Sequence, residues 1–174
     1  IDILIRKSYN NYIAVLWKGM RSLSVRNSAK AIVLHEGKIL VRLFPDVAPL
    51  TVSNFKSLVG SSFYNGLTIH RVIPDFVAQG GGFDATTGEA RSAERIIGEF
   101  VSNGQFNLIP HRRGTLSLAR PDDYNAGSNQ FFICQTELGY LDGYYASFGE
   151  ITGNFEVIDE ICNENTDESD KPIE

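Results

Sequence analysis

The sequence predicts a mostly β protein, a closed β-barrel or a sandwich. Short runs rich in β-branched and aromatic residues recur along the chain and are separated by clusters of Gly, Asn, Asp and Pro. Only two segments, about residues 48–59 and 155–162, place apolar residues at helical spacing. Many short strands with few helices are typical of barrels and sandwiches. With 174 residues, the chain is long enough for one domain with a sizeable core.

The order of the predicted elements is regular from residue 31 onward. A first strand pair flanks Glu36-Gly37, which is typical of a β-hairpin. The helix that follows ends at Gly60. The acidic, polar residues 163–174 are typical of a solvated tail. The predicted strands are residues 31–34, 38–44, 68–73, 76–79, 114–118, 130–135 and 145–151.

Composition argues against several classes of protein. The net charge of −5 disfavours a generic binder of nucleic acid or of anionic membranes. The longest apolar run near the start, Tyr12 to Trp17, is too short for a membrane span or a signal-peptide core, so a cytoplasmic protein is expected. Cys134 and Cys162 are expected to be small buried apolar residues rather than a disulfide. The histidines are scattered, so we expect no metal site.

Arg71 stands in a stretch, residues 63–83, that is otherwise largely apolar or glycine-rich. On a rigid strand beside Phe76 and Gln79, it can aim a planar fork of donors at a ligand on an apolar floor. The alternative is an edge-strand arginine that extends into water. These residues alone leave both readings open. Strand alternation predicts that the neighbouring His70 faces the opposite side.

Four blocks of sequence resemble the cyclophilins, a family of peptidyl-prolyl cis–trans isomerases. The blocks read HRVIPDFVAQGG, GTLSLAR, AGSNQFFI and YLDG…FG, in the family's order and with family-like spacing over about residues 31–161. The resemblance implies a closed eight-stranded antiparallel β-barrel capped by the two helices. It also implies an enzyme that rotates X–Pro bonds and assists protein folding without a metal or organic cofactor. The alternatives are a catalytically weak cyclophilin-like module that binds peptides in the same groove, or a small-ligand barrel, which a filled barrel interior disfavours.

The same resemblance assigns a role to each candidate site residue. It makes Arg71 the catalytic guanidinium and Gln79 the residue that orients it. Phe76 and Phe132 complete the catalytic set and form the proline socket. The implied socket and substrate-binding residues are, in addition, Val77, Ala119, Arg120, Gln130, Tyr140, Leu141 and Tyr145. The implied partners are proline-containing peptides and unfolded or flexible protein segments, with no nucleic acid and no membrane, and we expect a monomer.

The chain departs from the family's pattern at the rim of this site. Many members have tryptophan where this chain has Tyr140, and its indole donates a hydrogen bond to the cyclic peptide cyclosporin in members that bind it tightly. We therefore expect weakened cyclosporin binding with isomerisation retained. Arg120 replaces an asparagine of many members, and its charge is expected to favour substrates with acidic flanking residues.

The ends of the chain also differ from the family's pattern. The family's barrel closes with a last strand after a turn like Asp170-Lys171-Pro172, near which this sequence ends. Residues 1–29 are interpreted as an N-terminal segment and 30–174 as the cyclophilin-like domain. Ile1 to Arg6 alternates like a strand, so we expect it to close the barrel as in a circular permutation, with residues 8–28 as the connection. The alternative is a shortened domain with the N-terminal segment as a separate extension.

Overall fold

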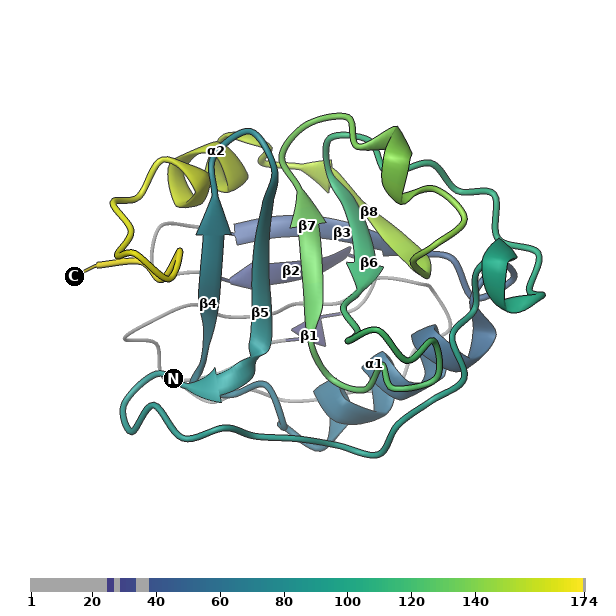
Figure 1. Ribbon diagram of the computed structural model, residues 1–174. Coiled ribbons are helices and arrows are strands. Elements are labelled where there is room, and N and C mark those ends of the chain that lie inside the picture. Colours follow the sequence, from purple (N-terminus) through teal and green to yellow (C-terminus); the bar gives the residue numbers. More distant parts are fainter. Residues whose placement is uncertain (1–24, 27–28, 34–37, 174) are drawn as a thin grey trace.

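The computed structural model describes residues 25–26, 29–33 and 38–173 (Figure 1). Both predicted helices are confirmed to within a residue. The elements are the strands β1 Val25–Arg26, β2 Ala29–Val33, β3 Lys38–Leu43, β4 Leu67–Ile73, β5 Val77–Asp84, β6 Thr115–Leu118, β7 Phe131–Cys134 and β8 Ser147–Gly153, the helices α1 Pro49–Gly60 and α2 Glu156–Cys162, and the single 3₁₀ turns η1 Val101–Asn103 and η2 Gly139–Leu141.

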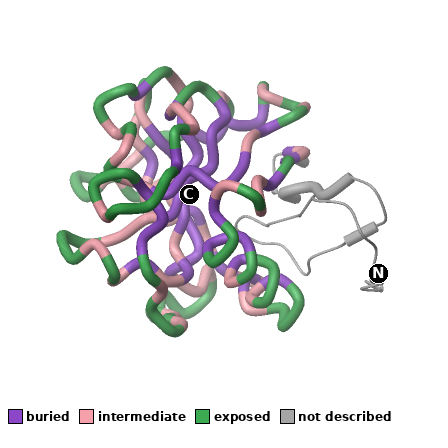
Figure 2. Tube along the Cα trace, turned by 90° about the vertical axis from the view of Figure 1, so that its right-hand side faces the viewer, coloured by how far each residue is buried: buried purple, intermediate pink, exposed green. Residues whose placement is uncertain are grey.

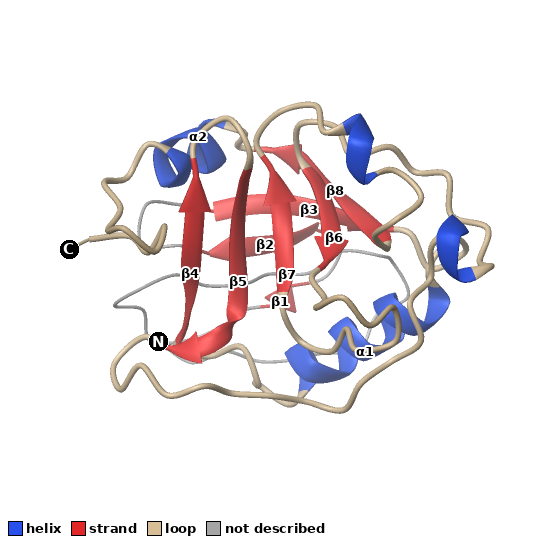
Figure 3. Cartoon of the chain, in the orientation of Figure 1, coloured by secondary structure: helices blue, strands red, loops and turns tan. Residues whose placement is uncertain are grey.

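The strands form one antiparallel sheet in the order β1-β2-β3-β8-β6-β7-β5-β4. Its body is the six strands β3 to β8, and the short β1 and β2 continue it beyond β3. The sheet bends so that β3 and β2 pass behind β4, β5, β7 and β6, while α1 and α2 lie at opposite ends (Figures 1 and 3). The mostly β class is therefore confirmed.

The expected closed eight-stranded barrel is wrong, because the six-stranded body is not closed. In the described part of the chain, no ladder joins β4 to β1, β2 or β3. At the outer edge of β4, the backbone N–H of Val72 instead donates to the carbonyl oxygen of Asp170, at 2.8 Å. Part of that edge is thus satisfied by the C-terminal segment rather than by a closing strand.

This C-terminal segment is mostly exposed to solvent, as its polar composition predicted, but it is folded rather than a free tail. Residues 165–173 form a turn closed by an isolated bridge between Thr166 and Pro172. The backbone N–H of Ile173 also donates to the carbonyl of Asn165, at 2.7 Å. We call residues 165–173 the C-terminal hairpin. The expected closing strand at residues 1–6 and the connection at 8–28 lie largely outside the described residues, so the permutation and the division at residue 29 stay predictions.

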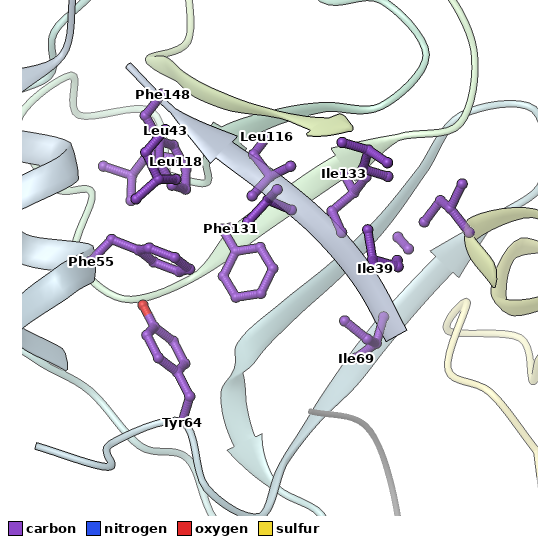
Figure 4. Packing of buried hydrophobic residues seen from close by; sticks show 14 of the residues in the cluster. Ile39, Leu43, Phe55, Tyr64, Ile69, Leu116, Leu118, Phe131, Ile133 and Phe148 are labelled. Carbon is purple, nitrogen blue, oxygen red and sulfur yellow. The ribbon is translucent and has the colours of Figure 1, made fainter. Parts of the chain in front are cut away.

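The main core lies between the bent sheet and the helices, and draws on all six strands of the body. Figure 4 shows the rings of Phe55, Tyr64 and Phe131 converging, and the ring centroids of these pairs and of Phe55–Phe148 are 5.1–5.8 Å apart. Burial raises the pKa of the Tyr64 hydroxyl far above its usual value, and this hydroxyl donates to the carbonyl of Asn129 at 2.8 Å. Figure 2 shows the buried trace inside a rim of exposed loops.

A buried carboxylate fixes the start of α1. Glu99 is buried and accepts hydrogen bonds from the backbone N–H groups of Leu50, at 2.9 Å, and Thr51, at 2.7 Å. These N–H groups have no partner within the helix, and a negative charge at a helix N-terminus is favourable. Pro49 occupies the first turn, where its missing N–H costs nothing.

Candidate active site

The sheet carries a second apolar cluster, separate from the core, which we call the outer cluster. Its buried members are Val77, Phe132, Cys134 and Leu138, and its partly buried members are Phe76, Ala119, Leu141 and Tyr145. Side chains alternate along a strand, so Phe132 and Cys134 lie on the face of β7 opposite to the core residues Phe131 and Ile133. The register places Val77 of β5 directly opposite Cys134.

The outer cluster brings together six of the residues that the sequence assigned to the site: Phe76, Val77, Ala119, Phe132, Leu141 and Tyr145. Sequence reasoning did not include Cys134 or Leu138. Burial raises the pKa of the Cys134 thiol to about 12, so this free cysteine serves as an apolar side chain, as predicted. Because side chains alternate along a strand, Cys134 could have been predicted on the same face of β7 as Phe132.

Arg71 and Gln79 lie beside this cluster through the strand register. Arg71 of β4 is opposite Gln79 of β5, and Gln79 is in turn opposite Phe132 of β7. The side-chain amide of Gln79 donates to Oε1 of Gln130, at 2.9 Å. Gln79 was expected to orient Arg71, but the partner that the structure gives to Arg71 is Asp170, whose Oδ2 accepts from Nε at 3.3 Å. Both side chains are half-exposed, at 40% and 43%.

A β-bulge changes the expected direction of His70. The ladder between β4 and β5 shifts register between Ile69 and Arg71, so His70 and Arg71 are both partly buried between the buried Ile69 and Val72. The prediction of simple alternation is therefore wrong at this point. Burial lowers the pKa of His70, and a side-chain hydrogen bond to Gln130 opposes that shift. The buried Nδ1 of His70 has no hydrogen-bond partner among the described residues.

A buried histidine, which sequence reasoning left unassigned, supports the outer cluster from behind. His111 stacks on Phe132 with centroids 5.9 Å apart and ring planes at 18°. Its Nδ1 lies 2.9 Å from Oδ1 of Asp142, and its Nε2 lies 3.0 Å from Oγ of Ser117. Burial lowers the pKa of His111, although Asp142 acts in the opposite direction. The ring is thereby fixed in orientation against the back of Phe132.

The rim residues Arg120, Tyr140 and Tyr145 occupy different environments. The guanidinium of Arg120 lies 4.6 Å from the ring centroids of Tyr124 and Tyr145, and its Nη2 donates to the carbonyl of Tyr144 at 2.8 Å. Tyr140 is 68% exposed, and its ring is nearly parallel to that of Phe76, 6.3 Å away. Tyr140 therefore covers Phe76, while the charge of Arg120 is already held by protein groups.

A cavity of about 940 Å³ lies elsewhere, beside the loop 84–88 and the C-terminal hairpin. Its lining includes His70, but none of the eleven residues that the sequence assigned to the site. In the described part of the chain, no three His, Cys, Asp or Glu side chains are grouped so that they could hold a metal ion. Among the same residues, no helix is long and apolar enough to cross a membrane.

Comparison with known families identifies this arrangement. The family model described as cyclophilin type peptidyl-prolyl cis-trans isomerase/CLD matches residues 30–174. The chain belongs to the cyclophilins. A peptidyl-prolyl cis-trans isomerase of Acinetobacter baylyi is 39% identical over 132 residues, which cover 73% of this chain and 68% of the relative. Another, of Schizosaccharomyces pombe, is 38% identical over 139 residues, or 79% of this chain and 87% of the relative.

Solved cyclophilin structures share the fold. A Cryptosporidium parvum cyclophilin type isomerase, crystallised in the presence of the dipeptide Ala-Pro, superposes with a TM-score of 0.74 at 29% identity, covering 84% of this chain and 92% of that chain. Family membership and the activity named for the relatives make this cyclophilin a peptidyl-prolyl cis–trans isomerase. The prediction of enzyme class is confirmed.

Proposed function

We propose that the outer cluster seats the proline ring of an X–Pro segment and that Arg71 catalyses rotation about its peptide bond. The observation that carries the proposal is the register Arg71–Gln79–Phe132 across three neighbouring strands. It sets a guanidinium, an amide and an aromatic ring side by side at the edge of an apolar cluster. The Ala-Pro dipeptide present with the Cryptosporidium parvum relative supports a proline-containing ligand.

The chemistry requires no nucleophile. Amide resonance raises a barrier of about 18–20 kcal/mol to rotation. In the twisted transition state the prolyl nitrogen regains a lone pair, which can accept a hydrogen bond from Arg71. That bond is absent in the planar ground state, so it stabilises the transition state selectively. A thousandfold acceleration requires about 4 kcal/mol, which a charged donor at a partly desolvated site can largely supply.

The amides of Gln79 and Gln130 are proposed to bind the backbone of the peptide beside the proline. Their mutual hydrogen bond fixes both side chains and leaves further donor and acceptor positions on each amide. Ala119, Tyr140 and Tyr145 complete the walls. The physiological substrates are proposed to be unfolded or flexible protein segments, whose X–Pro bonds isomerise slowly during folding. A cytoplasmic location and a monomeric state stay predictions.

Two features of the rim are proposed to set ligand preference. At Tyr140 a phenol stands where many members have an indole, so cyclosporin is proposed to bind weakly. Arg120 was expected to favour acidic residues that flank the proline. Its contacts with the Tyr124 and Tyr145 rings and the Tyr144 carbonyl argue that this preference is small.

The test compares two half-exposed arginines, each with one carboxylate partner. Arg42 of β3 pairs with Glu150 at 3.5 Å and has 52% side-chain exposure, which makes it a matched control for Arg71. Arg71→Ala is expected to lower kcat/KM on an Xaa–Pro tetrapeptide by about 100- to 1000-fold, a loss of about 3–4 kcal/mol. Arg42→Ala should leave it within twofold. A loss below threefold for Arg71→Ala, with the variant folded, would refute the proposed role.

A peptide-binding module without catalysis would behave differently in the same experiment. In that case both the wild type and Arg71→Ala would bind the tetrapeptide with similar affinity, and neither would accelerate exchange between its cis and trans forms. Two-dimensional exchange NMR on the peptide measures both quantities in one sample.

A further inference from the structure

The C-terminal hairpin contacts β4 at the residue that the proposed mechanism needs. Asp170, at its tip, uses two groups to hold two neighbouring residues of β4. Its carbonyl accepts from the backbone N–H of Val72 at 2.8 Å, and its Oδ2 accepts from Nε of Arg71 at 3.3 Å. Asp170 and Arg71 are 99 positions apart in the sequence. The contact therefore depends on the fold and not on local sequence.

The tip of the hairpin is a fixed turn. Oδ1 of Asp167 accepts from the backbone N–H groups of Ser169, at 2.8 Å, and Lys171, at 3.0 Å. The N–H of Asp170 donates to the carbonyl of Asp167, at 3.1 Å. Asp170 itself has a φ of 60°, the left-handed conformation that Asp and Asn tolerate better than most residues. The carboxylate of Asp170 is thus presented to Arg71 from an ordered support.

Asp170 accepts its hydrogen bond from Nε of Arg71, and the choice of this nitrogen decides which donors stay available. A guanidinium is a planar fork of five N–H donors, and Nε occupies the edge nearest the side-chain stem. In the described part of the chain, the hydrogen bond of Arg71 is made by Nε, and its Nη1 and Nη2 make none. Fixing the Nε edge sets the plane of the fork and leaves the terminal nitrogens for a substrate.

We propose that Asp170 is a positioning residue for isomerisation, which orients Arg71 through Nε so that Nη1 and Nη2 face the X–Pro bond. The proposal rests on the proposed function, since Asp170 acts only through Arg71. Asp170 does not touch the substrate, so its loss changes the rate of the chemical step and not the affinity for the peptide. Because the pair is half-exposed, the effect on the rate is moderate.

The main variant is Asp170→Gly, because glycine keeps the left-handed turn and the carbonyl bonded to Val72 while it removes the carboxylate. We expect kcat on an Xaa–Pro tetrapeptide to fall two- to fivefold, with KM unchanged. Glu168→Gln, which removes an exposed carboxylate from the same hairpin, is the matched control and should leave kcat unchanged. Thermal unfolding of both variants reports whether the fold is kept.

A double-mutant cycle with Arg71→Lys separates positioning from a structural role, because lysine keeps a charge but has no Nε. We expect Asp170→Gly to cause no further loss of kcat in the Arg71→Lys background. An equal fall of kcat in both backgrounds would overturn the proposal, because the role of Asp170 would then be structural. A rise of kcat in Asp170→Gly would also overturn it, because the hairpin would then restrain Arg71. The proposed function itself fails separately, if Arg71→Ala keeps wild-type activity.

Discussion

Phe131 and Phe132 are consecutive on β7, yet they belong to different apolar clusters. Phe131 is fully buried in the main core and contacts the rings of Phe55 and Tyr64. Phe132 belongs to the outer cluster, with the rings of His111 on one side and Tyr145 on another. The main core has helices at both ends, whereas the outer cluster is bounded by half-buried and exposed side chains.

We interpret this difference as a separation between residues that hold the fold and residues that are proposed to bind the substrate. The outer cluster has only four buried members, and six of its eight residues were assigned to the site from the motifs of the family. Arg71 and Gln79 lie beside it through the strand register, and apolar side chains next to polar ones are suited to an apolar ligand with a polar backbone. We therefore expect changes in the main core to alter stability, and changes in the outer cluster to alter catalysis.

The largest effect is expected from Phe131→Ala. Removing a fully buried ring should lower the free energy of unfolding by about 3–5 kcal/mol, because the cavity left behind cannot collapse completely. The kcat/KM of the fraction that remains folded should stay within about threefold of wild type. Urea unfolding and active-site-normalised kinetics measure the two quantities. If kcat/KM per folded molecule fell more than tenfold, the two clusters would not be separate in function.

Phe132→Ala is the reciprocal change. We expect kcat/KM to fall about 10- to 100-fold, or about 1.4–2.7 kcal/mol, because the proline ring would lose one wall of the proposed socket. The loss in unfolding free energy should be smaller than for Phe131→Ala, since Phe132 belongs to a cluster of only four buried residues. The same two assays apply. If Phe132→Ala lost stability but kept kcat/KM, Phe132 would be a core residue, and its assignment to the proposed socket would be wrong.

His111, which packs against the outer cluster, makes stability depend on pH. Burial lowers its pKa in the folded state, so the unfolded chain takes up a proton first as the pH falls below about 6.5. The stabilising contribution is therefore complete above that value, and is lost as the pH falls through the window down to the lowered pKa.

Urea unfolding at pH 8 and pH 5 should show lower stability at pH 5, and His111→Gln should reduce the difference. Part of the stability difference between pH 8 and pH 5 should remain in this variant, because burial also lowers the pKa of His70. If His111→Gln kept the full difference in stability between pH 8 and pH 5, His111 would not be the cause of that difference.

The smallest effect on isomerisation is expected from Tyr140→Trp. The side chain is 68% exposed and lies over Phe76, so kcat/KM should change less than threefold. The indole N–H restores a donor that a bound cyclic peptide can use, so cyclosporin should inhibit the variant more tightly than the wild type. Inhibition curves of both proteins test this. Equal inhibition would show that Tyr140 does not set the affinity.

Patterns local to the chain were sufficient to predict the helices and the mostly β class, whereas the resemblance to the cyclophilins supplied six of the eight residues of the outer cluster. Alternation along β7 and the motif around Arg71 are encoded by adjacent residues. The features that were missed depend on contacts between distant residues. The bulge at His70 requires the pairing of β4 with β5, and the partnership of Arg71 with Asp170 requires the C-terminal hairpin to fold back onto β4. Polar composition predicted the solvent exposure of residues 163–173 but not the hairpin that residues 165–173 form.

We propose that the outer cluster, and not the cavity of about 940 Å³ beside the C-terminal hairpin, receives the proline. An NMR titration of the isotope-labelled chain with an Ala-Pro-containing tetrapeptide tests it most directly. We expect the largest shifts of backbone amide signals at Phe76, Phe132 and Leu141, while the signals of Phe55 and Phe148 in the main core stay unchanged. Shifts concentrated instead on the loop 84–88, which lines the cavity of about 940 Å³, would contradict it.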